Sequence, residues 1–349
     1  MKIGYQFRSF LRWLISGIIL VMAASNGLAE ERPGYSTPRF MSNGQAISFN
    51  YCIEYNKPQT CSALMYDIAL DRFLAYQDSA GNRIIDVAVS PSGRLAAFIV
   101  QEAGFLFSRT QNCIGVLDIE SRRYRRAACS EEARRYPEFI SEDKIVFFAE
   151  ETTETKTGRK LRERKLFLMN LADMAEKQVV ATSFYAPSSP RSISEGRHVV
   201  FSDFGYVSRE NLRTKKTRSK EEPVTDLLRV SLANGNIEVI TPGKADFVGL
   251  KISLKSGTVY ALKQWSSPVA KGFVHDVYVF GPNGAQRITQ LEQFIWGMDV
   301  SPDERFLALT LATPDRKVMN GELLLYEVET KQFKKLDVMN RDELHISGE

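Results

Sequence analysis

The fold is decided by two similar stretches, IIDVAVSPSGRLAAF at residues 84–98 and IWGMDVSPDERFLAL at residues 295–309. In each stretch, mostly apolar residues lie on both sides of a Ser-Pro pair that is followed by small or polar residues. Proline presets the backbone torsion that the corner of a turn requires, and small polar residues tolerate the tight geometry that follows. Each stretch therefore predicts two buried or half-buried strands joined by a turn.

Both stretches continue in the same way. IGVLDIESRRY at residues 114–124 corresponds to LLLYEVETKQF at residues 323–333, and both predict a third strand, a short polar turn and a fourth strand. Weaker copies of the third strand occur along the rest of the chain, 47 to 61 residues apart, with corresponding positions at Asp67, Asp118, Asn170, Ser231, Phe280 and Glu327. Repeats of this length are typical of propeller blades, and no convincing long amphipathic helix interrupts them.

The sequence therefore predicts an all-β fold, a six-bladed β-propeller of four-stranded antiparallel blades. We expect blades at about residues 35–80, 81–130, 131–182, 183–242, 243–290 and 291–337, with a short C-terminal tail. Two stacked β-sandwich domains are the alternative, but a regular period throughout residues 30–349 favours one propeller. The sequence indicates neither the strand that closes the ring nor the oligomeric state.

The repeated turn resembles that of the TolB-like family of propellers. The motif is clear at Ser90–Arg94 and Ser301–Arg305, and partial at Ser141–Lys144 and Ser194–Arg197. The resemblance covers about residues 35–337, and it implies a six-bladed propeller that is commonly periplasmic and often a platform for protein binding. We expect no counterpart of the α/β domain that precedes the propeller in TolB, so the resemblance concerns the propeller only.

The N-terminal segment predicts export. Lys2, Arg8 and Arg12 precede an uncharged, mostly apolar stretch at Trp13–Ala24, and small residues at Gly27–Ala29 fit a cleavage site. We therefore expect residues 1–29 to be a signal peptide, with an uncleaved membrane anchor as the alternative. We expect no membrane span after cleavage. Removing its three basic residues from the 46 Lys and Arg leaves 43, against 42 Asp and Glu, so the mature chain is nearly neutral.

The four cysteines predict two disulfides. Cys113 and Cys129 are equidistant from the turn near Glu120–Ser121 in blade two, so they face each other across one hairpin. Cys52 and Cys61 flank a predicted turn in blade one in the same manner. An even number of cysteines in an exported chain favours disulfides, and the predicted location is periplasmic or secreted.

Catalytic signals are scarce. The three histidines, His198, His275 and His345, fall on different units, so we expect no metal site and assign each a structural or surface role. The sequence has no nucleophile elbow, nucleotide-binding loop or EF-hand spacing, so we expect no cofactor and assign no catalytic residue. Because propeller enzymes build their sites from distant blades, an enzyme remains the alternative.

Two basic segments indicate a binding surface. The connections between the second and third strands of blades three and four, Glu150–Lys165 and Gly205–Asp226, are long and rich in Lys and Arg. They form a docking surface, solvated loops without a partner, or one extended hairpin each. The candidate partner-binding residues are Arg159, Lys160, Arg162, Arg164, Arg213, Lys215, Lys216, Arg218 and Lys220.

The sequence thus favours a non-enzymatic scaffold of the cell envelope that docks a protein or another anionic envelope component through these basic segments. The alternative function is an enzyme that processes a carbohydrate or another small molecule at the central funnel. Export argues against nucleic acid as a partner. A further basic run at Arg122–Arg126 is interpreted as charge that protects the exposed edge of blade two.

Overall fold

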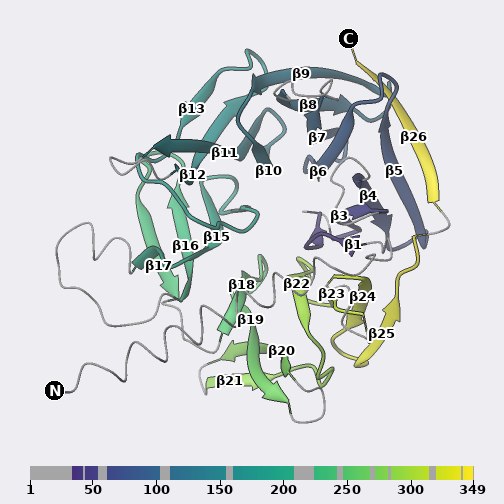
Figure 1. The fold of residues 1–349 in the computed structure, drawn as a ribbon, viewed down its shortest axis with the longest axis vertical. Helices are drawn as coiled ribbons and strands as arrows, with labels where there is room; N and C mark the ends of the chain where they lie inside the picture. Colours follow the sequence, from purple (N-terminus) through teal and green to yellow (C-terminus); the bar gives the residue numbers. More distant parts are fainter. Residues whose placement is uncertain are drawn as a thin grey trace. The chain divides into compact units, whose positions relative to one another are not determined.

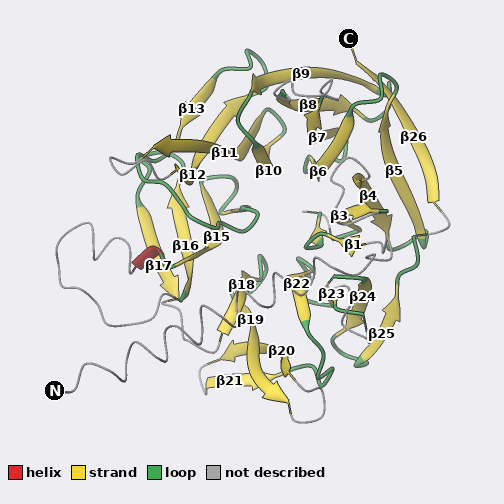
Figure 2. Cartoon of the chain, in the orientation of Figure 1, coloured by secondary structure: helices red, strands yellow, loops and turns green. Residues whose placement is uncertain are grey.

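Six blades of antiparallel strands are arranged in a ring in the computed structural model, which confirms the predicted propeller (Figure 1). The structure describes residues 34–41, 44–53, 61–102, 111–154, 160–207, 224–241, 247–267, 272–281, 284–313, 320–338 and 341–348. Strands and loops make up nearly all of them, with one short helical turn at residues 206–207 (Figure 2). The predicted signal peptide lies outside the described residues.

Each blade is built from strands that are consecutive in the sequence, running from the axis outwards. Blade one contains β1 (Gly34–Tyr35) and β2 (Arg39–Phe40), which both pair with β3 (Ala46–Cys52), followed by β4 (Cys61–Asp67) and β5 (Arg72–Asp78). Blade two contains β6 (Arg83–Val89), β7 (Leu95–Gln101), β8 (Asn112–Asp118) and β9 (Arg123–Ser130). Blade three contains β10 (Arg134–Ser141), β11 (Lys144–Glu154), β12 (Lys160–Asn170) and β13 (Glu176–Gln178).

The second half of the ring follows the same plan. Blade four contains β14 (Arg191–Ile193), β15 (His198–Phe204), β16 (Thr225–Ser231) and β17 (Ile237–Thr241). Blade five contains β18 (Phe247–Ile252), β19 (Val259–Ser267), β20 (Gly272–Gly281) and β21 (Gly284–Arg287). Blade six contains β22 (Ile295–Val300), β23 (Phe306–Leu311), β24 (Glu322–Glu327) and β25 (Gln332–Lys335). The third strands end at the repeat positions read from the sequence, except that β20 ends one residue after Phe280.

The Ser-Pro repeat forms the turn between the first two strands of a blade. The backbone N–H of Ser90 donates to the carbonyl of Leu95 at 2.8 Å, and that of Ser301 donates to the carbonyl of Phe306 at 2.9 Å. Each serine hydroxyl also accepts a hydrogen bond from the N–H of the same partner, at 3.1 Å and 2.8 Å. The serine thus satisfies polar groups at the start of the second strand, which explains its place in the motif.

The core is divided among the blade interfaces. Each of six clusters of buried apolar side chains joins two neighbouring blades, and the cluster between blades six and one combines Phe49 and Phe73 with Leu323. Burial of both faces of every blade explains why single blades are insufficient and why the ring must close.

Both disulfides lie within single hairpins, joining Cys52 to Cys61 and Cys113 to Cys129. The first pair joins directly opposite residues of β3 and β4. Structural disulfides of this kind are typical of proteins in an oxidising compartment. No helix in the described part of the chain is long and apolar enough to cross a membrane.

Among the described residues, ring closure uses no exchanged strand. Tyr35 and Asn320 join blades one and six through two hydrogen bonds, at 2.8 Å between Tyr35 N and Asn320 O and at 2.6 Å between Asn320 Nδ2 and Tyr35 O. The chain then continues into a further strand, β26 (Arg341–Gly348), where the sequence predicts only a tail. This strand pairs in parallel with β5 and reaches β9, so it straps blades one and two together (Figure 1).

The basic run of blade two has a different role from the predicted one. Residues 123 and 124 of β9 pair with the end of β26, so this part of the edge is covered. Arg126 forms ion pairs with Asp78 of blade one at 3.6 Å and Glu102 at 2.7 Å. Arg125 donates to the carbonyl of Leu171 of blade three at 2.6 Å. The interpretation as a protected free edge is therefore wrong at these positions, because the arginines tie neighbouring blades together.

Candidate functional site

The first basic connection extends the blade instead of forming a loop. Strands β11 and β12 pair as far as Glu154 and Lys160, so the predicted connection is mostly a long hairpin. The corresponding part of blade four falls largely outside the described residues. Six of the predicted partner-binding residues also lie outside the described residues: Arg159, Arg213, Lys215, Lys216, Arg218 and Lys220. Two more, Lys160 and Arg162, lie in β12, but their side chains are not described.

Arg164 is the remaining predicted residue, and it contributes to the structure of blade three. Its guanidinium donates to the carbonyl of Tyr185 at 3.1 Å and lies 3.4 Å from a carboxylate oxygen of Glu150. Partner binding by the basic segments stays a prediction.

The innermost strands place six equivalent residues around the axis. They are equivalent by their pairing across each blade. Each residue pairs with a residue of the second strand, and that residue pairs in turn with the third strand, two positions before the third strand ends. In blade order, this axial ring consists of Arg39, Ala88, Glu138, Arg191, Lys251 and Asp299. All six are buried, with 2–7% of their surface exposed. The ring therefore holds three cations, two carboxylates and one alanine.

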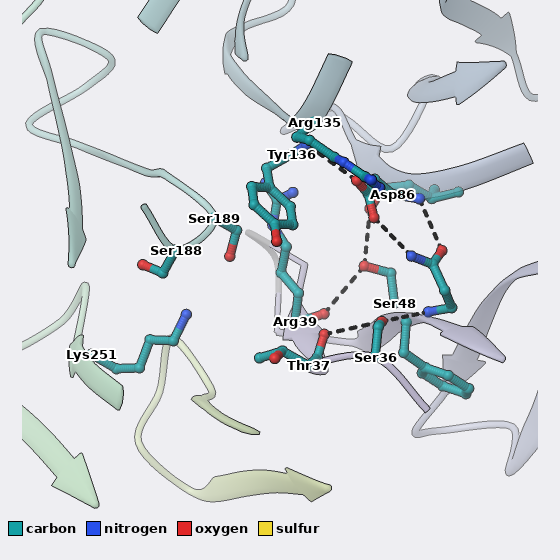
Figure 3. A pocket seen from close by; sticks show the side chains of 13 residues that line it. Ser36, Thr37, Arg39, Ser48, Asp86, Arg135, Tyr136, Ser188, Ser189 and Lys251 are labelled. Carbon is teal, nitrogen blue, oxygen red and sulfur yellow. Dashed lines mark hydrogen bonds between the residues drawn. The ribbon is translucent and has the colours of Figure 1, made fainter. Parts of the chain in front are cut away.

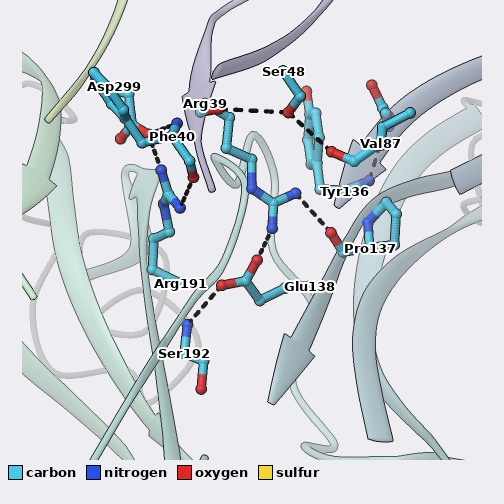
Figure 4. A network of polar contacts seen from close by, with 11 residues as sticks. Arg39, Phe40, Ser48, Val87, Tyr136, Pro137, Glu138, Arg191, Ser192 and Asp299 are labelled. Atoms are coloured by element: carbon cyan, nitrogen blue, oxygen red, sulfur yellow. Dashed lines mark hydrogen bonds and ion pairs between the residues drawn. The ribbon is translucent and has the colours of Figure 1, made fainter. Parts of the chain in front are cut away.

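Two of the cations form ion pairs across the ring (Figure 4). Arg39 pairs with Glu138 and also donates to the carbonyl of Pro137 at 2.6 Å. Arg191 pairs with Asp299 and also donates to the carbonyl of Phe40. Burial lowers the pKa of each arginine to about 9, so both stay charged at neutral pH.

Each carboxylate of these pairs also accepts a hydrogen bond from a backbone N–H group. Asp299 accepts a second hydrogen bond from the N–H of Phe40 at 2.7 Å, and Glu138 accepts one from the N–H of Ser192 at 3.1 Å. A buried charge is tolerated when it is both paired and hydrogen-bonded. The two pairs thus link blades one, three, four and six into a charged floor.

Lys251 is the third cation of the ring, and it differs from the other two. Among the described residues, no carboxylate forms an ion pair with its ammonium and no group accepts a hydrogen bond from it. Burial, reinforced by the positive charges of Arg191 and Arg39, lowers the pKa of Lys251 to about 7. Below about pH 7, the ring therefore carries a surplus positive charge at this side chain.

Lys251 extends into a cavity of about 200 Å³ that we call the polar chamber (Figure 3). Most of its lining side chains are polar, and they come from blade-to-blade links, from innermost strands and from β3 of blade one. The lining residues are Ser36, Thr37, Arg39, Ser48, Phe49, Asn50, Asp86, Val87, Arg135, Tyr136, Ser188, Ser189 and Lys251. Because alternate strands reverse direction, these links share one face of the ring with the ends of the second strands, so the chamber lies on the face where β11 and β15 end.

Asp86 is the carboxylate of the polar chamber. It accepts hydrogen bonds from Asn50 Nδ2 at 2.8 Å and from the N–H of Tyr136 at 3.3 Å. Figure 3 shows it on the opposite side of the chamber from Lys251. The two groups therefore give the chamber a negative and a positive end.

β-Bulges shape this wall of the funnel. The pairing registers of β6, β10 and β18 each shift where one residue has a positive φ: Asp86 at 56°, Tyr136 at 54° and Gly249 at 60°. Each of these residues precedes its member of the axial ring by two positions. A bulge re-aims the side chains around it, and positive φ is unfavourable for non-glycine residues. The strain at Asp86 and Tyr136 thus falls on residues that line the chamber.

A second cavity of about 340 Å³ adjoins the first, and we call it the aromatic chamber. Its walls include Leu262, Phe294, Trp296 and Met298, whereas Thr37, Ser188 and Lys251 line both chambers. Trp296 exposes 47% of its surface although it is a large aromatic residue. Lys251 therefore lies at the junction of a polar space and an apolar one.

His275 also lines the aromatic chamber, but both of its ring nitrogens have partners. Nε2 lies 3.2 Å from Gln264 Oε1, and Nδ1 accepts a hydrogen bond from the N–H of Ile295 at 3.1 Å. Burial lowers the pKa of His275, so it is neutral near pH 7. His198 begins β15 and His345 lies in β26, and the described residues contain no group of side chains suited to hold a metal ion.

The sequence does contain a signal for the axial ring. Lys251 is the only charged residue in the apolar strand Phe247–Ile252, and Asp299 is the only one in Ile295–Val300. An isolated charge in an innermost strand points to the axis of the ring. The sequence does not show which of these charges form ion pairs, because the pairing depends on the bulges that set the strand register.

Comparison with solved structures identifies the type of propeller. No family model and no curated protein matches the sequence. TolB from Acinetobacter baumannii is similar to the chain with a TM-score of 0.53 and 13% identity, over 93% of this chain and 68% of TolB. The chain has a TolB-like propeller fold.

A similar fold also occurs in an enzyme. An acylaminoacyl peptidase from Pyrococcus horikoshii is similar with a TM-score of 0.50 and 12% identity over 89% of this chain, which spans about half (53%) of the peptidase. At such low identities, the similarity shows the fold alone, so function must be argued from the site.

Proposed function

We propose that this chain is a binding propeller of the cell envelope, periplasmic or secreted, that docks an anionic part of a protein partner on the face where the axial funnel opens. One observation supports this proposal most directly. Lys251 is a buried cation without a carboxylate partner among the described residues, and it lines both chambers of the funnel. An anion supplied by a partner would balance its charge.

The electrostatics of the same face add to this argument. Arg135 also lines the polar chamber, and the strands that flank the predicted basic segments of blades three and four, β11 and β15, end on this face. Because the mature chain is nearly neutral, attraction of an acidic partner depends on local charge of this kind.

The location is inferred from two independent features. The N-terminal segment has the pattern of a signal peptide, and the two disulfides require an oxidising compartment to persist. Both features favour the periplasm or secretion.

Partner capture from an envelope extract tests the docking proposal. Tagged wild-type protein is compared with a variant in which Arg213, Lys215, Lys216, Arg218 and Lys220 are replaced by glutamine, and with Lys251→Met. Lys255→Met is the matched control, because Lys255 is exposed in the turn after β18, on the other face of the ring. We expect one acidic partner with wild type and control, and reduced recovery with both other variants at low salt.

Two outcomes contradict the proposal. Recovery that is unchanged in both test variants excludes docking through the basic segments and the funnel. Absence of any stoichiometric partner in the wild-type sample also contradicts it.

An enzyme acting in the funnel is the second candidate function. It is favoured by the pKa of Lys251, about 7, because such an amine can exchange a proton at neutral pH. Incubation with a panel of oligosaccharides and small esters distinguishes the two functions. Repeated turnover that is lost in Lys251→Met supports the enzyme, whereas binding without product supports docking.

A further inference from the structure

The chemistry of the funnel limits which anion it can accept. The two carboxylates of the axial ring are each paired with one arginine, so Lys251 carries the unbalanced charge of the ring. The polar chamber adds one further cation, Arg135, and one carboxylate, Asp86, whose charges offset each other. A monoanion compensates that charge, whereas a phosphate or sulfate dianion would leave a second charge buried in the ring. Charge balance therefore favours a carboxylate.

Ser188 provides a second polar group at the same place. Its hydroxyl oxygen accepts a hydrogen bond from the N–H of Ser202 at 3.0 Å, so its own O–H can donate to an anion. Ser188 and Lys251 line both chambers. A planar carboxylate at their junction can accept from a hydroxyl and an ammonium group at once.

The surroundings also fix where the rest of the ligand lies. Asp86 at the far end of the polar chamber repels an anion, while its own hydrogen bonds hold it in place. In the aromatic chamber, His275 is neutral and both of its nitrogens are engaged. Leu262, Phe294 and Trp296 offer apolar surface in a space of about 340 Å³, within the size range of small-ligand pockets.

We infer that the funnel binds a carboxylate that carries a bulky apolar group, with the carboxylate at Lys251 and Ser188 and the apolar group in the aromatic chamber. This inference rests on the proposed binding function and specifies the group that is bound. Both a peptide C-terminus with a large apolar last residue and a free carboxylic acid have this chemistry.

Isothermal titration calorimetry on the whole exported protein, at pH 6 and low salt, tests the inference. The probes are N-acetyl-phenylalanine, its amide, acetate, inorganic phosphate, and a peptide ending in phenylalanine with a free or amidated C-terminus. We expect N-acetyl-phenylalanine to bind wild type at least about tenfold more tightly than its amide does, because only the acid balances Lys251.

Variants separate the two halves of the ligand. Lys251→Met weakens binding of N-acetyl-phenylalanine by at least about tenfold, Lys251→Arg retains much of it, and the exposed control Lys255→Met has no effect. Trp296→Ala weakens binding of N-acetyl-phenylalanine by about tenfold but not binding of acetate, whereas Phe333→Ala, at an exposed aromatic residue of β25, changes neither.

The peptides distinguish the two sources of the carboxylate. Tighter binding of the free peptide than of N-acetyl-phenylalanine identifies a chain terminus, and the reverse order identifies a free acid. Either result supports the inference.

Three results would overturn it: no binding of any carboxylate by wild type up to about 10 mM, equal binding of acid and amide, or tighter binding of phosphate. Specific partner capture without carboxylate binding would refute this inference and leave the docking proposal standing. Carboxylate binding without capture of any protein partner would support this inference and refute the docking proposal.

Discussion

Arg191 and Lys251 occupy equivalent positions in neighbouring blades, yet their surroundings differ. Both are buried to a similar extent, with 6% and 7% of their surface exposed. Arg191 forms an ion pair with the carboxylate of Asp299 and donates a hydrogen bond to the carbonyl of Phe40. Lys251 lines a cavity and has no carboxylate partner among the described residues. The comparison suggests that a compensated charge joins blades, whereas an uncompensated one prepares a binding site.

The two side chains also differ chemically in a way that suits these roles. A guanidinium is planar, stays charged when buried and can serve a carboxylate and a carbonyl at once. An ammonium changes its pKa readily on burial, so its charge responds to what binds beside it.

Removing a carboxylate from the floor has the largest expected effect. Asp299→Asn leaves Arg191 buried without its anion, so the free energy of unfolding should fall by about 3–5 kcal/mol. Urea denaturation measures this loss. Asp342→Asn is the control, since that carboxylate is 66% exposed and lies in β26.

A double variant checks the interpretation of this loss. Arg191→Met combined with Asp299→Leu removes both charges and should cost less than Asp299→Asn alone. A change below about 1 kcal/mol in Asp299→Asn would show that the ion pair is not a structural element of the ring.

Removing the uncompensated charge should have the opposite sign. Lys251→Met keeps the apolar stem and removes a buried charge, so we expect the free energy of unfolding to rise by about 2 kcal/mol at pH 6. The exposed control Lys255→Met should change it by less than about 0.5 kcal/mol. Destabilisation by Lys251→Met would mean that Lys251 has a structural partner, and the contrast with Arg191 would disappear.

The smallest expected effect is the pH dependence of this stabilisation. The pKa of Lys251 is about 7 in the folded protein and 10.5 for an ordinary lysine, so the unfolded chain binds more protons between these values. Stability contributed by this site therefore rises with pH above about 7, and the gap between Lys251→Met and wild type should shrink by about 1 kcal/mol from pH 6 to pH 8.

Charged and titratable groups from several blades surround Lys251. They are Arg39 on β2, Asp86 on β6, Arg135 and Glu138 on β10, Arg191 on β14, His275 on β20 and Asp299 on β22. Burial lowers the pKa of His275 below its usual 6.5, and the pKa of about 9 keeps Arg39 and Arg191 charged. Denaturation of both proteins at pH 6, 7 and 8 measures the gap, and a constant gap contradicts the lowered pKa of Lys251.

Local sequence was sufficient for the parts of the fold that depend on local chemistry. The Ser-Pro turns, the ends of the third strands and the facing of Cys113 and Cys129 all follow from short segments whose turn residues fix the hairpin. The repeat then gives the number of blades, since each interface needs a neighbour on both sides.

Long-range contacts decided the rest. The strap β26 pairs with strands more than 200 residues earlier, and the tail carries no turn signal that indicates such a partner. The ion pair between Arg191 and Asp299 joins residues 108 positions apart, and one of its strands, β22, is bulged.

The sequence by itself determined the six-bladed repeat, the hairpin cysteines and the isolated charges of the innermost strands, because periodicity and turn chemistry are local. Only the tertiary structure decided which of those charges would be paired. A β-bulge shifts the register, and closure of the ring brings distant blades to one axis, so Arg39 and Arg191 find carboxylates there while Lys251 lines the funnel.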